Sequence, residues 1–280
     1  MPEQVWLVTG SSRGLGRSIV EEALAAGHRV AATARRIDSL ADLADKYGDR
    51  LLPIVLDVTD ATRAQRAVAE AIAFFGRLDV VVNNAGYADL VAIEDISLDD
   101  FRAQMDAVFY GTVYVTKAAL PHFVSRGTGH FIQVTSVGGR ATAPGVGAYQ
   151  SGKWAVEGFS GVLAKEAGPL GVKVTLAEPG AMRTDWAGSS MDIPKISPRY
   201  DATVGAMARS VRGRSGSEPI DPAKVARVLL DVAQMVEPPL HLLLGSDAVG
   251  LIDEEMKRVK AEDDRWAELG RSVDYDAGLR

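Results

Sequence analysis

Seven short apolar runs recur along the chain, separated by longer segments rich in alanine and charged residues. Their Val, Ile and Leu residues are nearly continuous and do not alternate with polar residues, which indicates strands buried on both faces. The runs cover residues 5–9, 28–33, 51–56, 78–83, 129–136, 171–179 and 240–244. Buried strands that alternate with helices predict a parallel sheet with helices on both sides.

The alternation continues without a linker, an internal repeat or a low-complexity tract to about residue 245. We therefore predict an α/β, single-domain, doubly wound fold of the Rossmann type over residues 1–245, with about seven parallel strands and helices on both faces. Residues 186–220 are its least regular part, and we expect them to form a mobile lid over a substrate. Residues 246–280 contain a charged helical stretch, which we expect to be a helical extension packed on the same domain.

Composition argues against several kinds of function. The net charge of −6 speaks against nucleic-acid binding, which normally shows as a basic patch. The absence of cysteine excludes a disulfide, a thiol nucleophile and a thiolate metal site, and is typical of a reducing compartment. The histidines, His28, His122, His130 and His241, have no ligand spacing, so we expect no metal site. No apolar run is long enough to span a membrane, and we expect a cytoplasmic protein that acts on a small molecule.

A glycine-rich turn follows the first apolar run directly. Gly10, Gly14 and Gly16 stand between that run and a helical segment, where glycine lets the backbone turn tightly and approach a pyrophosphate. Amides at the start of the helix would then bind the phosphate charge. A strand, a glycine-rich turn and a helix at the start of an alternating chain predict a dinucleotide site.

The end of the second predicted strand indicates which dinucleotide binds. An NAD site places an acid there to bind the ribose 2'-hydroxyl, whereas this strand ends in Ala34, Arg35 and Arg36. Arg13, within the glycine-rich turn, adds another cation. A small residue followed by arginine leaves room and charge for a 2'-phosphate, so we predict NADP(H) as the preferred cofactor and NAD(H) as the alternative. Arg35 and Arg36 could also simply begin a solvated loop.

Tyr149 and Lys153 stand four positions apart in AYQSGKW, residues 148–154. In a helix they lie one turn apart on one face, so the lysine charge can favour the phenolate form of the tyrosine. A free tyrosine titrates near ~10 and is a poor proton shuttle at neutral pH. Such pairs also occur on ordinary helix surfaces with their polar tips in water. The pair alone therefore does not establish catalysis.

Five motifs stand in order along the chain: TGxxxGxG at 9–16, NNAG at 83–86, Ser136 thirteen residues before Tyr149, YxxxK at 149–153, and PG at 179–180. Together they resemble the short-chain dehydrogenase/reductase family, and the resemblance covers about residues 4–245. It implies a Rossmann-type fold, a nicotinamide cofactor, and interconversion of a carbonyl and an alcohol by hydride transfer.

The resemblance assigns cofactor binding to the matching positions. Asp57 and Val58 match the position that contacts the adenine, and Asn83 begins the motif that steadies the central sheet. Pro179 and Thr184 match the stretch that meets the nicotinamide end. The predicted cofactor residues are Thr9, Gly10, Ser12, Arg13, Gly14, Leu15, Gly16, Arg35, Arg36, Asp57, Val58, Asn84, Ala85, Gly86, Tyr149, Lys153, Pro179, Gly180 and Thr184.

The resemblance also implies three catalytic residues. Tyr149 matches the general acid and base, which gives a proton to a carbonyl oxygen or takes one from an alcohol. Lys153 would favour the phenolate and bond the nicotinamide ribose. Ser136, at the end of the predicted 129–136 strand, would hold the substrate oxygen by a hydrogen bond. The alternative for Ser136 is a serine that caps the end of its strand.

Two positions depart from the family pattern. Most members have an asparagine three residues before the glycine of the helix that precedes the serine, where it holds a water chain from the lysine to solvent. Here that position is Val108, three before Gly111, and valine cannot hydrogen-bond a water. We therefore expect slower turnover than an asparagine would allow. Gly152 stands where serine is common, although glycine disfavours a helix interior by about 1 kcal/mol.

The enzyme interpretation has one alternative from another class, an NADP(H)-binding regulatory or sensor protein with little or no turnover. Val108 favours that alternative, whereas the intact catalytic residues argue against it. The resemblance further implies a homodimer or homotetramer formed through long helices at about 97–125 and 148–168. We expect a small lipophilic substrate, because the residues expected near the site are Tyr87, Val137, Met182, Trp186 and Met191, unless these only pack the lid onto the body.

Overall fold

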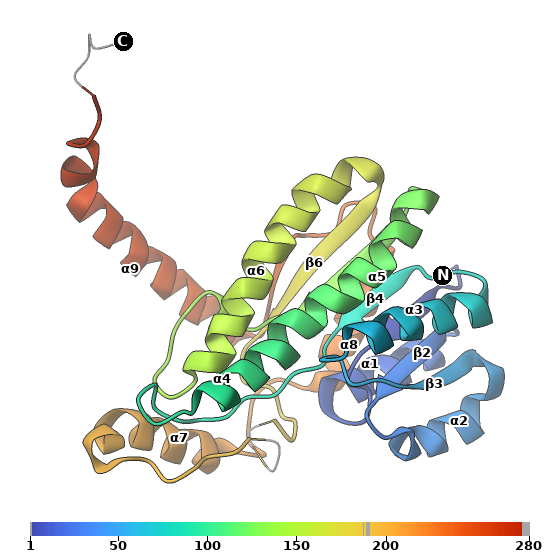
Figure 1. The fold of residues 1–280 in the computed structure, drawn as a ribbon, viewed down its shortest axis with the longest axis horizontal. Helices are drawn as coiled ribbons and strands as arrows, with labels where there is room; N and C mark the ends of the chain where they lie inside the picture. Colours follow the sequence, from blue (N-terminus) through green and yellow to red (C-terminus); the bar gives the residue numbers. More distant parts are fainter. Residues whose placement is uncertain (1, 187, 189–190, 276–280) are drawn as a thin grey trace.

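The structure is a computed structural model that describes residues 2–186, 188 and 191–275. One sheet of seven parallel strands runs in the order β3-β2-β1-β4-β5-β6-β7 (Figure 1). Each apolar run predicted from the sequence forms one strand, which confirms the single-domain doubly wound fold. The strands are β1 (Val5–Val8), β2 (Arg29–Ala34), β3 (Leu51–Val55), β4 (Val80–Asn83), β5 (Gly129–Val134), β6 (Val172–Pro179) and β7 (His241–Leu244).

Helices cover both faces of the sheet. One face packs against α1, α2 and α8 around Trp6, and the other packs against α3, α5 and α6 around Phe131. Both aromatic side chains are fully buried. Among the described helices, none combines the length and apolarity needed to cross a membrane. The helices are α1 (Gly14–Ala25), α2 (Ala41–Tyr47), α3 (Ala61–Phe75), α4 (Leu98–Met105), α5 (Gly111–Arg126), α6 (Gly147–Ala167), α7 (Ala206–Arg214), α8 (Pro222–Gln234) and α9 (Ser246–Arg271).

The long helix predicted at 97–125 contains an irregular turn. Helix α4 continues through a π-helical turn, Asp106–Tyr110, into α5. Short π-helical turns inside α-helices occur frequently at functional sites. Val108 lies within this turn and is 1% exposed, so the unusual backbone coincides with the departure from the family pattern.

The segment predicted as an irregular lid contains more helix than its composition suggests. A 3-10 turn (Pro198–Tyr200) and a π-helical turn (Asp201–Gly205) lead into α7. Residues 187, 189 and 190 of the segment lie outside the described residues. Met191, Val204 and Val211 are buried in one apolar cluster with Tyr149, so this segment covers the N-terminal part of α6.

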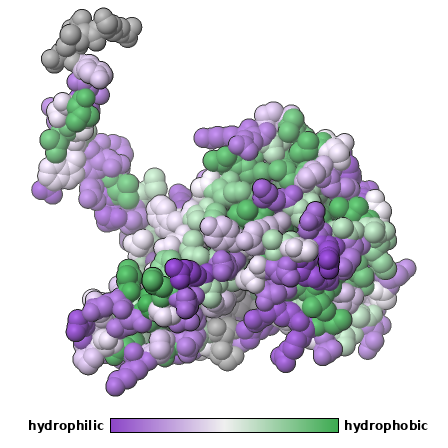
Figure 2. Space-filling view, viewed as in Figure 1, coloured by the Kyte–Doolittle hydropathy of each residue, from purple (hydrophilic) through white to green (hydrophobic). Residues whose placement is uncertain are grey.

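Among the described residues, the C-terminal extension is buried against the domain only in its first turns. Ala248 and Ile252 are its buried residues, and beyond them α9 projects away from the body (Figure 1). Figure 2 shows hydrophobic and hydrophilic residues interspersed along the projecting part. Ion pairs one turn apart, such as Asp253–Lys257 and Lys260–Asp264, stabilise a helix that has little tertiary packing.

Candidate active site

The predicted site residues gather at one edge of the sheet, where the parallel strands end. Thr9 follows β1, Asn84 follows β4, Ser136 follows β5 and Gly180 follows β6. The strand order reverses between β1 and β4, so the loops that follow these two strands lead to helices on opposite faces of the sheet, α1 and α5. Open α/β sheets bind ligands in this place.

The glycine-rich turn has no room for side chains at two of its glycines. Gly10 has a φ of +68°, and a Cβ there would lie 2.9 Å from the Ala85 Cα. A Cβ on Gly16 would lie 2.3 Å from the Gly10 carbonyl oxygen. The first turn of α1 therefore lies directly against the β1 loop. This close approach is the form that a pyrophosphate-binding turn requires.

Two polar residues hold this turn to the end of β4. The Thr9 hydroxyl accepts hydrogen bonds from the backbone N–H groups of Asn84 (3.0 Å) and Ala85 (3.1 Å). In return, the Asn84 amide donates to the carbonyl oxygens of Thr9 (2.9 Å) and Gly10 (3.2 Å). The preceding Asn83 is buried and donates to Thr116 and Gln133, so it steadies the centre of the sheet.

The arginines predicted to bind the 2'-phosphate of the cofactor lie on the surface in two different settings. Arg35 and Arg36 follow β2, are exposed, and make no ion pair with any described residue. Arg13 pairs with Asp185 at 3.0 Å, which joins the glycine-rich turn to the residue that precedes the lid segment. Arg35 and Arg36 thus remain available to an anionic ligand, while Arg13 already has an acidic neighbour.

The remaining predicted cofactor residues differ in what their side chains can do. Leu15 is 7% exposed and packs into the core, so only its backbone can face a ligand. Asp57 is exposed and accepts hydrogen bonds from Thr59, while Val58 is buried against Gly111. Ser12 and Gly86, in the loops that follow β1 and β4, are exposed. The sequence thus places these positions at the site without distinguishing side-chain from backbone roles.

The PG loop is fixed by the base of α9. The Ala181 N–H donates to the Asp247 carboxylate at 2.7 Å, and a Cβ on Gly180 would collide with the same carboxylate. Thr184, further along, lies over Gly14, whose added Cβ would be 3.6 Å from the threonine Cβ. The loop predicted to meet the nicotinamide end therefore also closes over the phosphate turn.

Tyr149 and Lys153 are buried on one face of α6, 9% and 5% exposed respectively. The Lys153 Nζ donates to the Val134 carbonyl oxygen at 2.7 Å and lies 5.6 Å from the centroid of the Tyr149 ring. Ser136 is two residues beyond Val134, so the end of β5 contacts both partners. The structure thus brings the three predicted catalytic residues together.

Ser136 also has the structural role that the sequence left open. Its hydroxyl accepts from the Gly138 N–H at 3.1 Å, at the start of a short 3-10 turn (Val137–Gly139), and lies 3.5 Å from the Pro179 carbonyl oxygen. Capping and substrate binding are compatible, since a hydroxyl has two acceptor lone pairs and one donor.

Burial dominates the proton affinities of the pair. Burial raises the pKa of Tyr149 to about 12, and the neighbouring Ser136 hydroxyl opposes that rise. Burial lowers the pKa of Lys153 to about 8, and the negative charge of Glu157 opposes that fall. The sequence argument that Lys153 favours the phenolate therefore left out the larger effect, which is the desolvation of both groups.

The two departures from the family pattern touch each other. A Cβ on Gly152 would lie 2.9 Å from the Val108 Cγ1 and 3.1 Å from its Cβ. Val108 also lies against Gly86, whose added Cβ would be 3.6 Å from the Val108 Cγ2. The valine therefore fills the space that a side chain at position 152 would need. Packing against Val108 thus explains the glycine at this position, which the sequence alone did not explain.

The apolar residues expected near the substrate fall into two groups. Trp186 and Met191 belong to the cluster around Tyr149, and the Trp186 ring centroid is 5.5 Å from that of Tyr149. Met182 packs against the core on the α1 side of the sheet instead, so it does not line the same cluster. Tyr87 and Val137 are half-buried at the strand ends.

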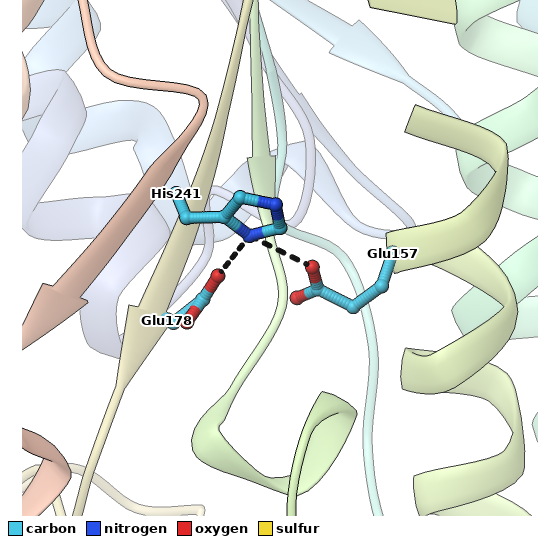
Figure 3. A group of neighbouring side chains, drawn as sticks. All are labelled: Glu157, Glu178 and His241. Atoms are coloured by element: carbon cyan, nitrogen blue, oxygen red, sulfur yellow. Dashed lines mark hydrogen bonds and ion pairs between the residues drawn. The ribbon is translucent and has the colours of Figure 1, made fainter. Parts of the chain in front are cut away.

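Three titratable residues that the sequence did not single out lie beside the catalytic helix. Glu157, on α6, and Glu178, on β6, converge on His241 of β7 (Figure 3). Glu157 could have been noticed, because it follows Lys153 by the same four residues that separate Lys153 from Tyr149. The strand residues become neighbours only through the pairing of β6 with β7.

The chain is similar to several known proteins. The family model for short chain dehydrogenases matches residues 4–193. Oxidoreductase BOA17 of Botryotinia fuckeliana is 52% identical, over 95% of this chain and 97% of its own. A crystal structure of a short-chain dehydrogenase from Streptomyces avermitilis is 38% identical with a TM-score of 0.92, covering 98% and 100% of the two chains. The closed form of a serine dehydrogenase complexed with NADP+ is 27% identical with a TM-score of 0.74, covering 86% and 94%.

Proposed function

Because the chain belongs to the short-chain dehydrogenase family and is an oxidoreductase of that family, we propose that it interconverts a carbonyl and an alcohol by NADP(H)-dependent hydride transfer. The observation that carries the proposal is the meeting of Ser136, Tyr149 and Lys153 beside the glycine-rich turn. A bound nicotinamide cofactor would supply or accept the hydride. The protein's residues then bind, orient and move a proton.

Each catalytic residue acts at a stated atom. In reduction, the Tyr149 hydroxyl gives its proton to the carbonyl oxygen of the substrate, and in oxidation the phenolate takes the proton from the alcohol. The Ser136 hydroxyl donates to the same substrate oxygen and stabilises the negative charge that develops on it. The Lys153 ammonium stabilises the phenolate and would donate to the ribose of a bound nicotinamide cofactor. Water is kept out by Trp186 and Met191, which pack around Tyr149.

NADP(H) is the proposed cofactor in preference to NAD(H). Arg35 and Arg36 are exposed beyond β2 and have no ion pair with a described residue, so a 2'-phosphate gives them a partner. Arg13 would contribute after exchanging part of its contact with Asp185. The glycines at positions 10 and 16 leave the space for the pyrophosphate. The related serine dehydrogenase complexed with NADP+ supports this choice.

A small lipophilic substrate fits the residues around Tyr149. Trp186 and Met191 offer apolar surface beside the phenol, and Val137 follows Ser136 directly. The polar groups that would orient a substrate are few, which is typical of sites for apolar small molecules.

A homodimer or homotetramer is the proposed assembly. Tyr110, Trp154 and Val162 are 44%, 49% and 54% exposed on the π-helical turn and α6. Exposed large apolar side chains on two adjacent long helices favour a contact between copies.

A panel of carbonyl and alcohol compounds, assayed with NADPH and NADP+, tests the proposal. We expect turnover of at least one lipophilic ketone or aldehyde, measured as the loss of NADPH absorbance. A protein that binds NADPH tightly but turns over no compound of the panel would instead be the sensor that Val108 favours. NADH affinity equal to NADPH affinity would contradict the cofactor preference alone.

A further inference from the structure

Three titratable side chains from three elements form a cluster that extends from the interior to the surface. The His241 Nδ1 lies 2.7 Å from the Glu178 Oε1 and 3.5 Å from the Glu157 Oε2 (Figure 3). The Glu178 side chain is fully buried and that of Glu157 is 10% exposed. The side chain of His241 is 47% exposed. The imidazole therefore connects a buried carboxylate with solvent.

The two carboxylates have different surroundings. Arg140 pairs with the Glu178 Oε2 at 3.0 Å, so the charge of Glu178 is balanced within the protein. Neither side-chain oxygen of Glu157 makes a hydrogen bond within the described part of the chain. A buried charge without hydrogen bonds is costly. Burial accordingly raises the pKa of Glu157 to about 7, and the nearby negative charge of Glu178 adds to the rise. Glu157 can therefore gain or lose a proton near neutral pH.

Glu157 also follows Lys153 along α6, without a direct hydrogen bond or ion pair between the two charged groups. The two residues are one turn apart on α6, and the charge of Glu157 raises the pKa of Lys153. A Cβ on Gly139 would lie 3.1 Å from the Glu157 Oε1 and 3.4 Å from the Lys153 carbonyl oxygen, so the loop after Ser136 presses on both residues. The Val108 side chain and the Lys153 Nζ both lie near Gly86, within 3.6 and 3.9 Å of an added Cβ, and the apolar valine offers no hydrogen bond.

Resting on the proposed function, we propose that Glu157 and His241 carry protons between Lys153 and solvent during turnover. In reduction, the Tyr149 O–H bond breaks and its proton goes to the substrate oxygen. The Lys153 ammonium then gives a proton to the phenolate and becomes a neutral amine. The Glu157 carboxylic acid returns a proton to that amine through a water between the two groups, and the His241 imidazolium, which exchanges protons with solvent, returns one to Glu157. In oxidation every proton moves in the opposite direction.

The alternative role for the same three side chains is to bind a divalent cation, because their candidate ligand atoms all lie within 4.8 Å of one another. Two contacts favour proton transfer. The 2.7 Å separation between His241 and Glu178 is that of a hydrogen bond, and Arg140 places a positive charge on the same carboxylate. A cation would have to break the hydrogen bond between His241 and Glu178 and lie close to the positive charge of Arg140.

The test compares kcat across pH for three variants, using a carbonyl substrate from the panel at saturating NADPH. Glu157→Gln keeps the volume of the side chain but cannot titrate, and His241→Asn removes the group at the surface. Glu166→Gln, an exposed carboxylate of the same helix, is the matched control. We expect kcat of Glu157→Gln to fall by about tenfold, less than a direct acid–base group contributes, with KM unchanged.

Two readouts separate proton transfer from a structural role. In the wild type, kcat for reduction falls as pH rises through about 7, because Glu157 loses the proton that it must donate. Glu157→Gln loses this dependence, and added imidazole buffer restores its kcat with increasing concentration. Should Glu157→Gln not fold, the half-exposed His241→Asn variant carries the same buffer test.

An active wild type with unchanged kcat and no response to buffer in either variant would overturn the proton route and leave the proposed function standing. Absence of turnover in the wild type would overturn both. Loss of wild-type activity in EDTA, restored by zinc or manganese, would replace the proton route with a cation site.

Discussion

The glycine-rich turn and the catalytic face of α6 lie at the same edge of the sheet but are built differently. At the turn, backbone meets backbone, and a Cβ on Gly16 would lie 2.3 Å from the Gly10 carbonyl oxygen. On α6, side chains meet side chains, as when Val108 fills the space above Gly152. A contact between backbone atoms leaves no room for any side chain, whereas two side chains in contact can be substituted together. This difference explains why the chain keeps the family pattern at the turn and departs from it beside Lys153.

The largest expected effect comes from Gly16→Ala. The added methyl must displace the β1 loop from α1, and overpacking of this kind costs about 1–3 kcal/mol or more. Because each 1.4 kcal/mol is tenfold in affinity, we expect NADPH to bind about 5- to 140-fold more weakly in titration calorimetry. Gly158→Ala on α6 is the control, since nothing lies within 4 Å of its added Cβ. It should stabilise the protein by about 1 kcal/mol. Equal NADPH binding by the wild type and Gly16→Ala would remove the distinction between the two regions.

Gly152→Ala should destabilise the protein by about 1–2 kcal/mol in denaturant unfolding, because its Cβ meets the Val108 side chain. Val108→Ala alone leaves a cavity and also destabilises. The double variant should be more stable than the sum of the single changes predicts, with a coupling of about 0.5–3 kcal/mol. If the change in unfolding free energy of the double variant equals the sum of the two single changes, the two positions do not depend on each other.

Arg35→Ala and Arg36→Ala should each weaken NADPH binding by about tenfold, equivalent to the loss of ~1.4 kcal/mol, and leave NADH binding unchanged. The reason is that only NADPH carries the 2'-phosphate. Raised salt should reduce the same preference. If both cofactors weaken equally in either variant, the arginine concerned supports the loop and does not read the phosphate.

Val108→Asn is expected to have the smallest effect, a rise in kcat of less than about tenfold. The asparagine restores a group that can hydrogen-bond a water beside Lys153, and Gly152 leaves it space. The rise should be larger in a Glu157→Gln background, where the proposed proton route through His241 is blocked. A kcat that falls in both backgrounds would contradict a limit set by proton supply.

The sequence predicted the parts of the molecule that depend on local chemistry. Seven apolar runs gave seven strands, and the long helix at 97–125 and the glycine-rich turn lie where expected. These features are readable because periodicity and glycine conformation act within a few residues. The π-helical turn around Val108 was not predicted, since one extra residue in a turn leaves no periodicity signal of its own.

Features that depend on partners distant in the sequence were missed. Glu178 and His241 become neighbours only when β6 pairs with β7. Met182 joins the core on the α1 side and not the Tyr149 cluster, because the chain turns there to bridge Ile220. The direction of α9 depends on contacts at its base, where Ala248 and Ile252 are buried and Asp247 accepts a hydrogen bond from Ala181. The charged sequence of 246–280 predicts a helix but not these contacts.

The central claim is that the buried Tyr149 hydroxyl moves the proton during carbonyl reduction. Tyr149→Phe removes one oxygen atom and keeps the ring that packs against Trp186. The decisive measurement is kcat of this variant beside its dissociation constant for NADPH. We predict that kcat falls by at least about 100-fold, as expected for a direct acid–base group, while NADPH affinity changes by less than about threefold. Turnover that persists in Tyr149→Phe, with NADPH still bound, would contradict the account.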